Sequence, residues 1–155
     1  MSPFTPISSD EKIATLIEAA FDTKLPVVGG WGYHKDDATI IQSNPNNLPL
    51  SQIEHMLASM RAYLEMSITQ PKPQRYGSIN LNEKERETIT EDDRCYHKVI
   101  YEISAMKESD YATFIEEYKE GYGSDDFNME AHFQRRKEAT LIRHEPYWFE
   151  VSALV

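Results

Sequence analysis

Four polar side chains in the second half of the chain are the first candidates for chemistry: His97, Tyr101, His132 and Arg136. Imidazole, phenol and guanidinium groups orient ligands and exchange protons when they converge in a largely apolar pocket. His97 and Tyr101 share one face of an alternating segment, and His132 and Arg136 have the i, i+4 spacing of one helix face. If the two pairs meet, they form a small-molecule-binding or enzymatic pocket between helices and sheet.

The same side chains also have a structural interpretation. His97 shares its strand face with Val99 and Ile103, which favours packing near the end of the core. The aliphatic stem of Arg136 can cover apolar surface while its charged head stays in water. Both interpretations stay open, because sequence order does not show which distant side chains meet.

His34, Asp36 and Asp37 gather an imidazole and two carboxylates within four positions. These groups could hold a divalent metal ion or serve as a general acid and base. A metal site needs ligands from several elements, however, and an H-x-D-D sequence between short strands is typical of a solvated bend. The three residues are therefore weak metal candidates, and the bend is favoured.

The sequence motifs that identify common cofactor sites are absent. Neither glycine-rich phosphate-binding pattern occurs, and neither do H-E-x-x-H, G-x-S-x-G or the EF-hand loop. The single cysteine, Cys95, excludes an intrachain disulfide and a multi-cysteine zinc site. No cofactor is predicted.

Tyr96 and Trp148 are the candidate interface residues, because the strand registers place them away from the main apolar stripe. Exposed aromatic side chains often dominate binding energy at interfaces. Residues 147–154 are expected to form the last strand, and both faces of that strand are fairly apolar, which is typical of a strand inside a sheet or at an interface. A homodimer is one assembly that this pattern predicts.

The alternation of helical and strand patterns predicts an α+β fold, with an antiparallel sheet and three to four amphipathic helices packed mainly on one face. Helices are expected after two S-x-x-E capping boxes, at Ser8 and Ser51, and again near residues 109–120 and 126–138. Strands are expected at 38–42, 94–106 and 147–154, and a short strand from Pro26 precedes a flexible glycine-rich stretch at 29–33. An exposed charged hairpin is expected within 79–89. Residues 1–155 are expected to form a single globular domain.

Charge is the strongest guide to partners. With a formal net charge of -10, the chain repels nucleic-acid phosphates and anionic membranes, so neither is an expected partner. The lack of an apolar leader and the lone cysteine favour the cytoplasm. The first hypothesis is a binding or regulatory protein that acts through protein–protein contacts, such as an immunity-like or antitoxin-like inhibitor of a basic protein. The pocket described above is the alternative.

Overall fold

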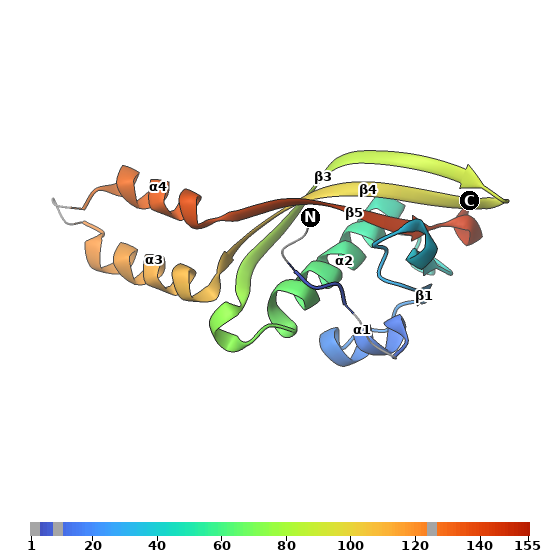
Figure 1. Ribbon diagram of the computed structural model, residues 1–155, viewed down its shortest axis with the longest axis horizontal. Helices are drawn as coiled ribbons and strands as arrows, with labels where there is room; N and C mark the ends of the chain where they lie inside the picture. Colours follow the sequence, from blue (N-terminus) through green and yellow to red (C-terminus); the bar gives the residue numbers. More distant parts are fainter. Residues whose placement is uncertain (1–3, 8–10, 124–126) are drawn as a thin grey trace.

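The computed structural model describes residues 4–7, 11–123 and 127–155, and it has an α+β fold (Figure 1). The five strands form one sheet in the order β1-β2-β5-β4-β3. The strands are β1 Val27–Gly29, β2 Thr39–Ile41, β3 Tyr76–Glu91, β4 Arg94–Lys107 and β5 Leu141–Glu150. The helices are α1 Ile13–Phe21, α2 Leu50–Tyr63, α3 Glu108–Gly121 and α4 Met129–Ala139. The short segments η1 Lys35–Asp37, η3 Lys72–Gln74 and η4 Ser152–Leu154 are 3-10 helices, and η2 Leu64–Ile68 is a π-helical turn that directly follows α2.

The predicted fold class is confirmed, and the sheet is mostly antiparallel. β3, β4 and β5 form its long antiparallel part, and β1 and β2 form the predicted short hairpin. β2 joins β5 in parallel, with Thr39 opposite Phe149. The sheet is therefore mixed, and β5 lies at its centre rather than at an edge.

The core lies between one face of the sheet and the helices α1 and α2 (Figure 1). On β4 the buried residues recur every second position, as the sequence predicts for an interior strand, and include Val99, Tyr101 and Ile103. Opposite them, α2 buries Leu57 and Ala58 and begins without a side-chain cap. The capping box predicted at Ser51 is wrong, because Glu54 points into the interior instead of back to the helix start. The box predicted at Ser8 falls partly outside the described residues.

Two strand boundaries differ from the prediction. The charged hairpin expected within 79–89 is one long edge strand, and the chain reverses at Asp92 and Asp93, which both have positive φ. Two residues of this type match the twist of a tight β-hairpin turn. β5 covers Leu141–Glu150 and is followed by η4, whereas the alternation of side chains in the sequence predicts a strand at residues 147–154. Charged residues along β3 suit its edge position, since they discourage pairing with another strand.

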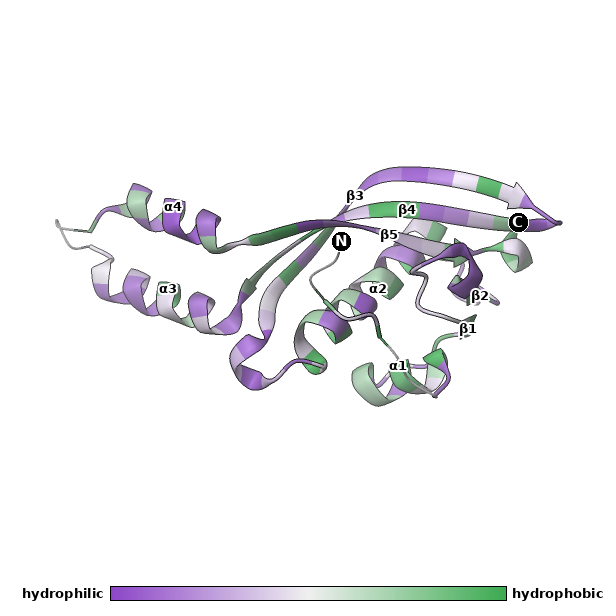
Figure 2. Cartoon of the chain, in the orientation of Figure 1, coloured by the Kyte–Doolittle hydropathy of each residue, from purple (hydrophilic) through white to green (hydrophobic). Residues whose placement is uncertain are grey.

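α3 and α4 form an antiparallel helical hairpin that projects beyond the end of the sheet (Figure 1). We call this hairpin the arm and define it as residues 108–123 and 127–139. β4 runs directly into α3, and only Thr140 separates α4 from β5, so the arm continues the two central strands. Colouring by hydropathy shows mainly hydrophilic residues along it, with scattered apolar ones (Figure 2).

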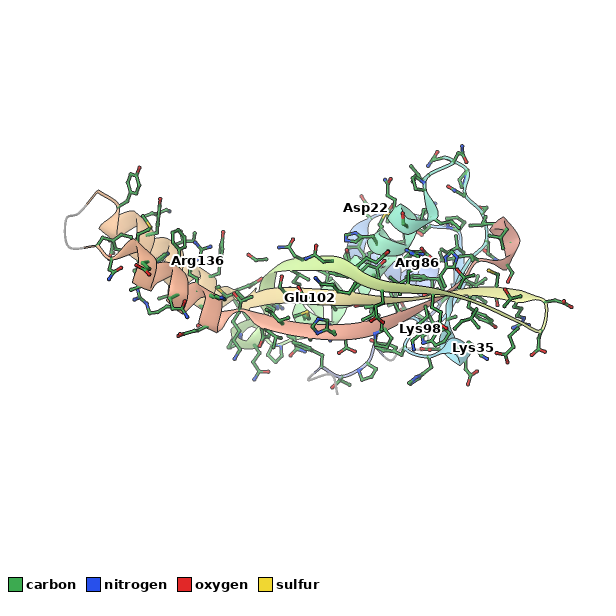
Figure 3. The ribbon with its side chains drawn as sticks, turned by 90° about the horizontal axis from the view of Figure 1, so that it is seen from above. Asp22, Lys35, Arg86, Lys98, Glu102 and Arg136 are labelled. Atoms are coloured by element: carbon green, nitrogen blue, oxygen red, sulfur yellow. The ribbon has the colours of Figure 1, made fainter. Side chains whose placement is uncertain are left out.

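The sheet face opposite α2 carries no helix among the described residues (Figure 3). Its side chains are largely charged and pair with one another: Glu102 lies within ion-pair distance of Lys84, at 3.9 Å, and of His144, at 3.1 Å. Lys98 lies over the Trp148 ring, 5.4 Å from its centroid. This face is therefore suited to contact with water.

Candidate protein-binding site

The structure separates the four predicted ligand-binding residues into two pairs. His97 and Tyr101 lie on β4, whereas His132 and Arg136 lie on α4 in the arm, where Figure 3 labels Arg136. The helix and strand positions of each pair agree with the sequence patterns, but the two elements do not bring the pairs together. A single pocket lined by all four residues is therefore not formed.

His97 belongs to a buried polar cluster under the first half of α2. Its Nδ1 lies 2.7 Å from Oε2 of Glu54, which has no exposed surface. A carboxylate only accepts hydrogen bonds, so Nδ1 carries the proton, and the 3.4 Å approach of Arg86 Nη1 to the same nitrogen is a contact only. Arg86 donates to the other Glu54 oxygen over 2.7 Å and to Glu83 over 2.6 Å. Hydrogen bonds to these carboxylates, Glu83 first, raise the pKa of Arg86.

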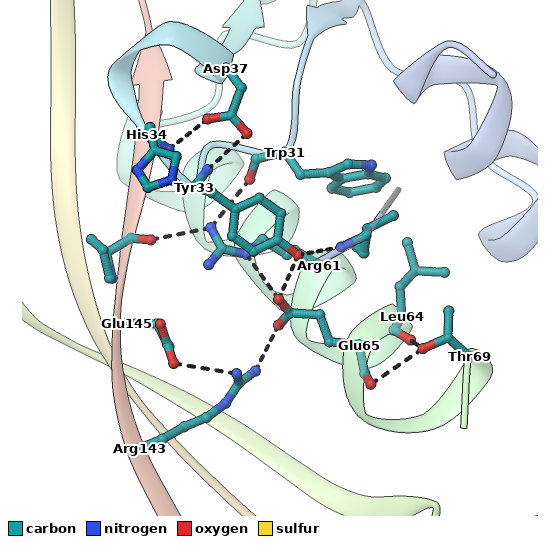
Figure 4. Close-up of polar contacts among 12 residues, drawn as sticks. Trp31, Tyr33, His34, Asp37, Arg61, Leu64, Glu65, Thr69, Arg143 and Glu145 are labelled. Carbon is teal, nitrogen blue, oxygen red and sulfur yellow. Dashed lines mark hydrogen bonds and ion pairs between the residues drawn. The ribbon is translucent and has the colours of Figure 1, made fainter. Parts of the chain in front are cut away.

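A second buried cluster, the Arg61–Glu65–Arg143 cluster, lies under the other end of α2 (Figure 4). Arg61 is 1% exposed, and its guanidinium lies between the rings of Tyr33 and Tyr147, 3.8 Å from each centroid. It also donates to the carbonyl oxygens of Trp31, over 3.3 Å, and Pro146, over 3.2 Å. These contacts join α2 to the loop before η1 and to β5.

Glu65 supplies the negative charge of this second cluster. It accepts a hydrogen bond from Arg143 over 2.7 Å and one from the Tyr33 hydroxyl over 2.6 Å (Figure 4). Burial, and then the charge of Glu65, raise the pKa of Tyr33. One carboxylate thus lies between two guanidinium groups in a closed interior, an arrangement that positions elements and offers no access to a substrate.

Sequence reasoning missed both clusters. Glu54, Arg61 and Glu65 recur at i, i+7 and i+11, which is one face of a helix, and this recurrence was the available signal. The apolar stripe that includes Ile53, Leu57 and Leu64 predicts which side of this helix faces the core, but it does not indicate that the charged residues beside it are buried as well. Charged residues are rarely fully buried unless they are paired. Here Glu54 and Glu65 are paired with residues of the distant strands β3, β4 and β5, and sequence order does not reveal these partners.

His132 is the centre of the arm's own small core. It is fully buried among the rings of Phe114, Tyr118, Phe127 and Phe133, all with centroids 5.5–5.9 Å away. Its Nδ1 lies 3.3 Å from Oε1 of Glu117, but neither ring nitrogen makes a hydrogen bond within the described residues. The aromatic stripes of α3 and α4 therefore pack on each other instead of on the sheet.

The outer surface of the arm combines exposed aromatic rings with negative charge. α3 has no fully buried residue, and Tyr122 is 68% and Phe133 50% exposed. α3 carries five acidic residues and one lysine, a difference of −4. A groove of about 690 Å³ follows α3, lined by Ala112, Thr113, Glu116, Glu117, Glu120, Gly121 and Phe127. Among these, Glu117 already pairs with Arg135 of α4.

The other sequence candidates lie in the body of the protein. Asp37 accepts hydrogen bonds from the backbone N–H groups of His34, over 2.5 Å, and Tyr33, over 3.3 Å, so its carboxylate closes the η1 turn. Within the described ranges, no group of three His, Cys, Asp or Glu side chains is arranged to hold a metal ion. Tyr96 is 7% exposed beneath Lys35, and Trp148 is half-buried beneath Lys98. Neither ring offers as much surface to a partner as Tyr122 or Phe133.

No family model matches this chain, and comparisons with curated proteins and with solved structures also give no match. Among the described residues, no helix combines the length and the apolar character needed to cross a membrane. The interpretation of the arm therefore depends on its own geometry and charge.

Proposed function

We propose that this is a cytoplasmic binding or regulatory protein that captures a basic protein through the acidic groove and exposed aromatic rings of the arm. One combination of features carries the proposal. The helix α3 has a charge difference of −4, and the exposed rings of Tyr122 and Phe133 lie beside it on the projecting arm. Aromatic side chains supply much of the energy at protein interfaces, and complementary charge speeds encounter. An inhibitor of a basic enzyme or toxin is one role that fits.

The positions of the groove carboxylates favour a cationic partner. Glu116 and Glu120 are exposed, four residues apart, and near the C-terminal end of α3. Like charges at i, i+4 repel, and the Glu120 carboxylate in the last turn of α3 opposes the macrodipole by about 0.3–1 kcal/mol. A lysine or arginine side chain bound in the groove would relieve both effects, whereas an acidic or neutral partner would not.

A capture experiment with matched variants tests this function. The purified protein is immobilised, and a cell extract of its source is passed over it at low and high ionic strength. We expect a basic protein to be retained at low salt, and its affinity to fall at least about tenfold in the Glu116→Gln/Glu120→Gln variant. Glu85→Gln/Glu87→Gln on the exposed edge strand β3 makes the same change in net charge away from the arm and serves as the control.

A further double variant tests the apolar part of the surface. Tyr122→Ala/Phe133→Ala is expected to lower retention without altering its salt dependence, because it removes contact area and no charge. Retention of no basic protein, or equal retention by both charge variants, would refute the proposal. Sedimentation shows whether the chain self-associates, and self-association lost in the arm variants would make a second copy the partner instead.

A further inference from the structure

A cleft at the root of the arm differs from the rest of the molecule in its charge. It measures about 250 Å³, and its lining includes Ser78, Asn80, Ser104, Arg136, Lys137 and Thr140. Its charged lining within the described residues consists of Arg136 and Lys137, without a carboxylate. Two cations sharing one cleft are unexpected in a chain with 26 acidic and 16 basic residues.

Neither cation is neutralised by a neighbour among the residues that the structure describes. Over the described ranges, no ion pair or side-chain hydrogen bond engages the Arg136 guanidinium or the Lys137 ammonium group. Arg136 instead lies over the Phe133 ring, 5.7 Å from its centroid, and this contact orients the guanidinium while leaving its charge available. By contrast, the adjacent Arg135 pairs with Glu117 of α3.

The rest of the lining supplies neutral hydrogen-bond donors. Ser78 and Ser104 contribute hydroxyl groups, and Asn80 contributes an amide. Thr140 does not add a free donor, because its hydroxyl donates to the Arg136 carbonyl over 2.8 Å. That bond occupies a carbonyl at the end of α4, which would otherwise repel an anion.

A β-bulge turns β3 toward this cleft. The register of β3 and β4 shifts between Gly77 and Asn80, so that Ser78 and Ile79 lie opposite Ala105, and Ser78 has φ +50°. Bulges re-aim side chains and occur often beside functional sites. Here the bulge brings a serine from the sheet toward two cations from the arm.

We propose that this cleft binds a small molecule carrying a phosphate monoester, with Arg136 and Lys137 holding the phosphate and the serine hydroxyls completing its hydrogen bonds. A phosphate monoester carries about −1.5 to −2 charge at neutral pH, which two cations balance. The volume of about 250 Å³ leaves room for a small organic group beside the phosphate. Because the overall charge is -10, long-range attraction does not help, and affinity must come from these contacts.

Backbone amide NMR on the full chain tests the site with two probes, inorganic phosphate and glycerol phosphate, at constant ionic strength set by sodium chloride. We expect saturable shifts at Ser78, Ser104 and Arg136–Lys137, with tighter binding of glycerol phosphate. Tighter binding of inorganic phosphate would identify the free ion as the ligand and would overturn the ester assignment. Equal shifts with chloride alone would overturn the site altogether.

Charge-matched variants separate the cleft from general electrostatics. Arg136→Gln/Lys137→Gln is expected to weaken phosphate binding by at least about a hundredfold, since each charge-assisted contact contributes about tenfold. Lys98→Gln/Lys119→Gln also removes two positive charges, but from residues outside the cleft, and it is expected to leave the affinity for phosphate unchanged. Equal weakening in both variants would overturn the proposal, and amide spectra of each variant show directly whether it remains folded.

Discussion

Arg143 of β5 donates to Glu65 of η2 across 2.7 Å in the protein interior, although 78 residues separate them in the chain. The same carboxylate accepts from Tyr33 and lies 3.5 Å from Arg61 Nε. Glu65 therefore joins three elements that meet only in the folded protein. Breaking such a buried group leaves charges without compensation.

Replacement of Glu65 by alanine is expected to lower the free energy of unfolding by about 3–5 kcal/mol, because it removes the carboxylate that Arg61 and Arg143 share in the interior and leaves Arg143 with the longer 3.5 Å pair to Glu145. Urea unfolding followed by circular dichroism measures the change. Glu18→Ala removes an exposed carboxylate 3.8 Å from Lys24 and is expected to change stability by less than about 1 kcal/mol. Similar losses in the two variants would contradict the assigned role of Glu65.

Tyr33, which is half-buried, and Tyr147, which is fully buried, are expected to respond differently to loss of the hydroxyl group. Tyr33→Phe removes the donor to Glu65 and should destabilise the protein by about 1–3 kcal/mol. The Tyr147 hydroxyl is buried without a hydrogen-bond partner among the described residues, so Tyr147→Phe should be neutral or stabilising. Thermal unfolding of the pair gives the comparison, and the reverse order of stability would contradict the contacts described.

Buried tyrosines are also expected to resist ionisation. Burial raises the pKa of Tyr33, Tyr101 and Tyr147 above the ordinary value of 10.0. A pKa raised in the folded state favours folding below pH 10, and that contribution is lost as the pH rises toward the folded-state value. Absorbance titration of the folded protein should therefore show part of the tyrosine signal rising only well above pH 10, and loss of that late part in Tyr33→Phe, Tyr101→Phe or Tyr147→Phe assigns it. Completion of the whole tyrosine signal near pH 10 in the folded protein would contradict the prediction.

Glu83 is expected to make stability depend on pH in the acid range. The hydrogen bonds from Arg86 lower the pKa of Glu83 below its ordinary value of 4.5. A lowered folded-state pKa favours folding above pH 4.5 and loses this effect as the pH falls through the folded-state value. Unfolding free energies at several pH values should show a shallower acid decline for Glu83→Gln than for the wild type. The effect is small, since Glu83 is partly exposed and solvent screens its pair.

The tip of the arm provides a test of its internal packing. The Phe127 ring occupies the space where a side chain at position 121 would lie, so Gly121→Ala must displace the ring. Crowding of this kind costs about 1–3 kcal/mol. Hydrogen exchange should therefore become faster in α3 and α4 and stay unchanged in β4. Unchanged exchange in the arm would mean that Phe127 does not hold the two helices together.

Local patterns in the sequence determined much of this fold. Alternation from Arg94 to Met106 predicted β4 and its buried face, and the apolar stripe around Leu57 predicted α2, because side-chain direction repeats every two residues in strands and about every 3.6 in helices. The i, i+4 spacing correctly placed His132 and Arg136 on one helix. The acidic character of the surface also followed from composition.

Tertiary structure alone decided where the polar groups meet. Arg61 falls outside the apolar stripe of its helix, yet it is buried between Tyr33 and Tyr147, which come from other elements. The aromatic stripes of α3 and α4 satisfy each other, so these helices project as an arm instead of covering the sheet, and His132 lies apart from His97. Periodicity identifies which face of an element is apolar, but the choice of the surface that covers it depends on packing between elements distant in the chain.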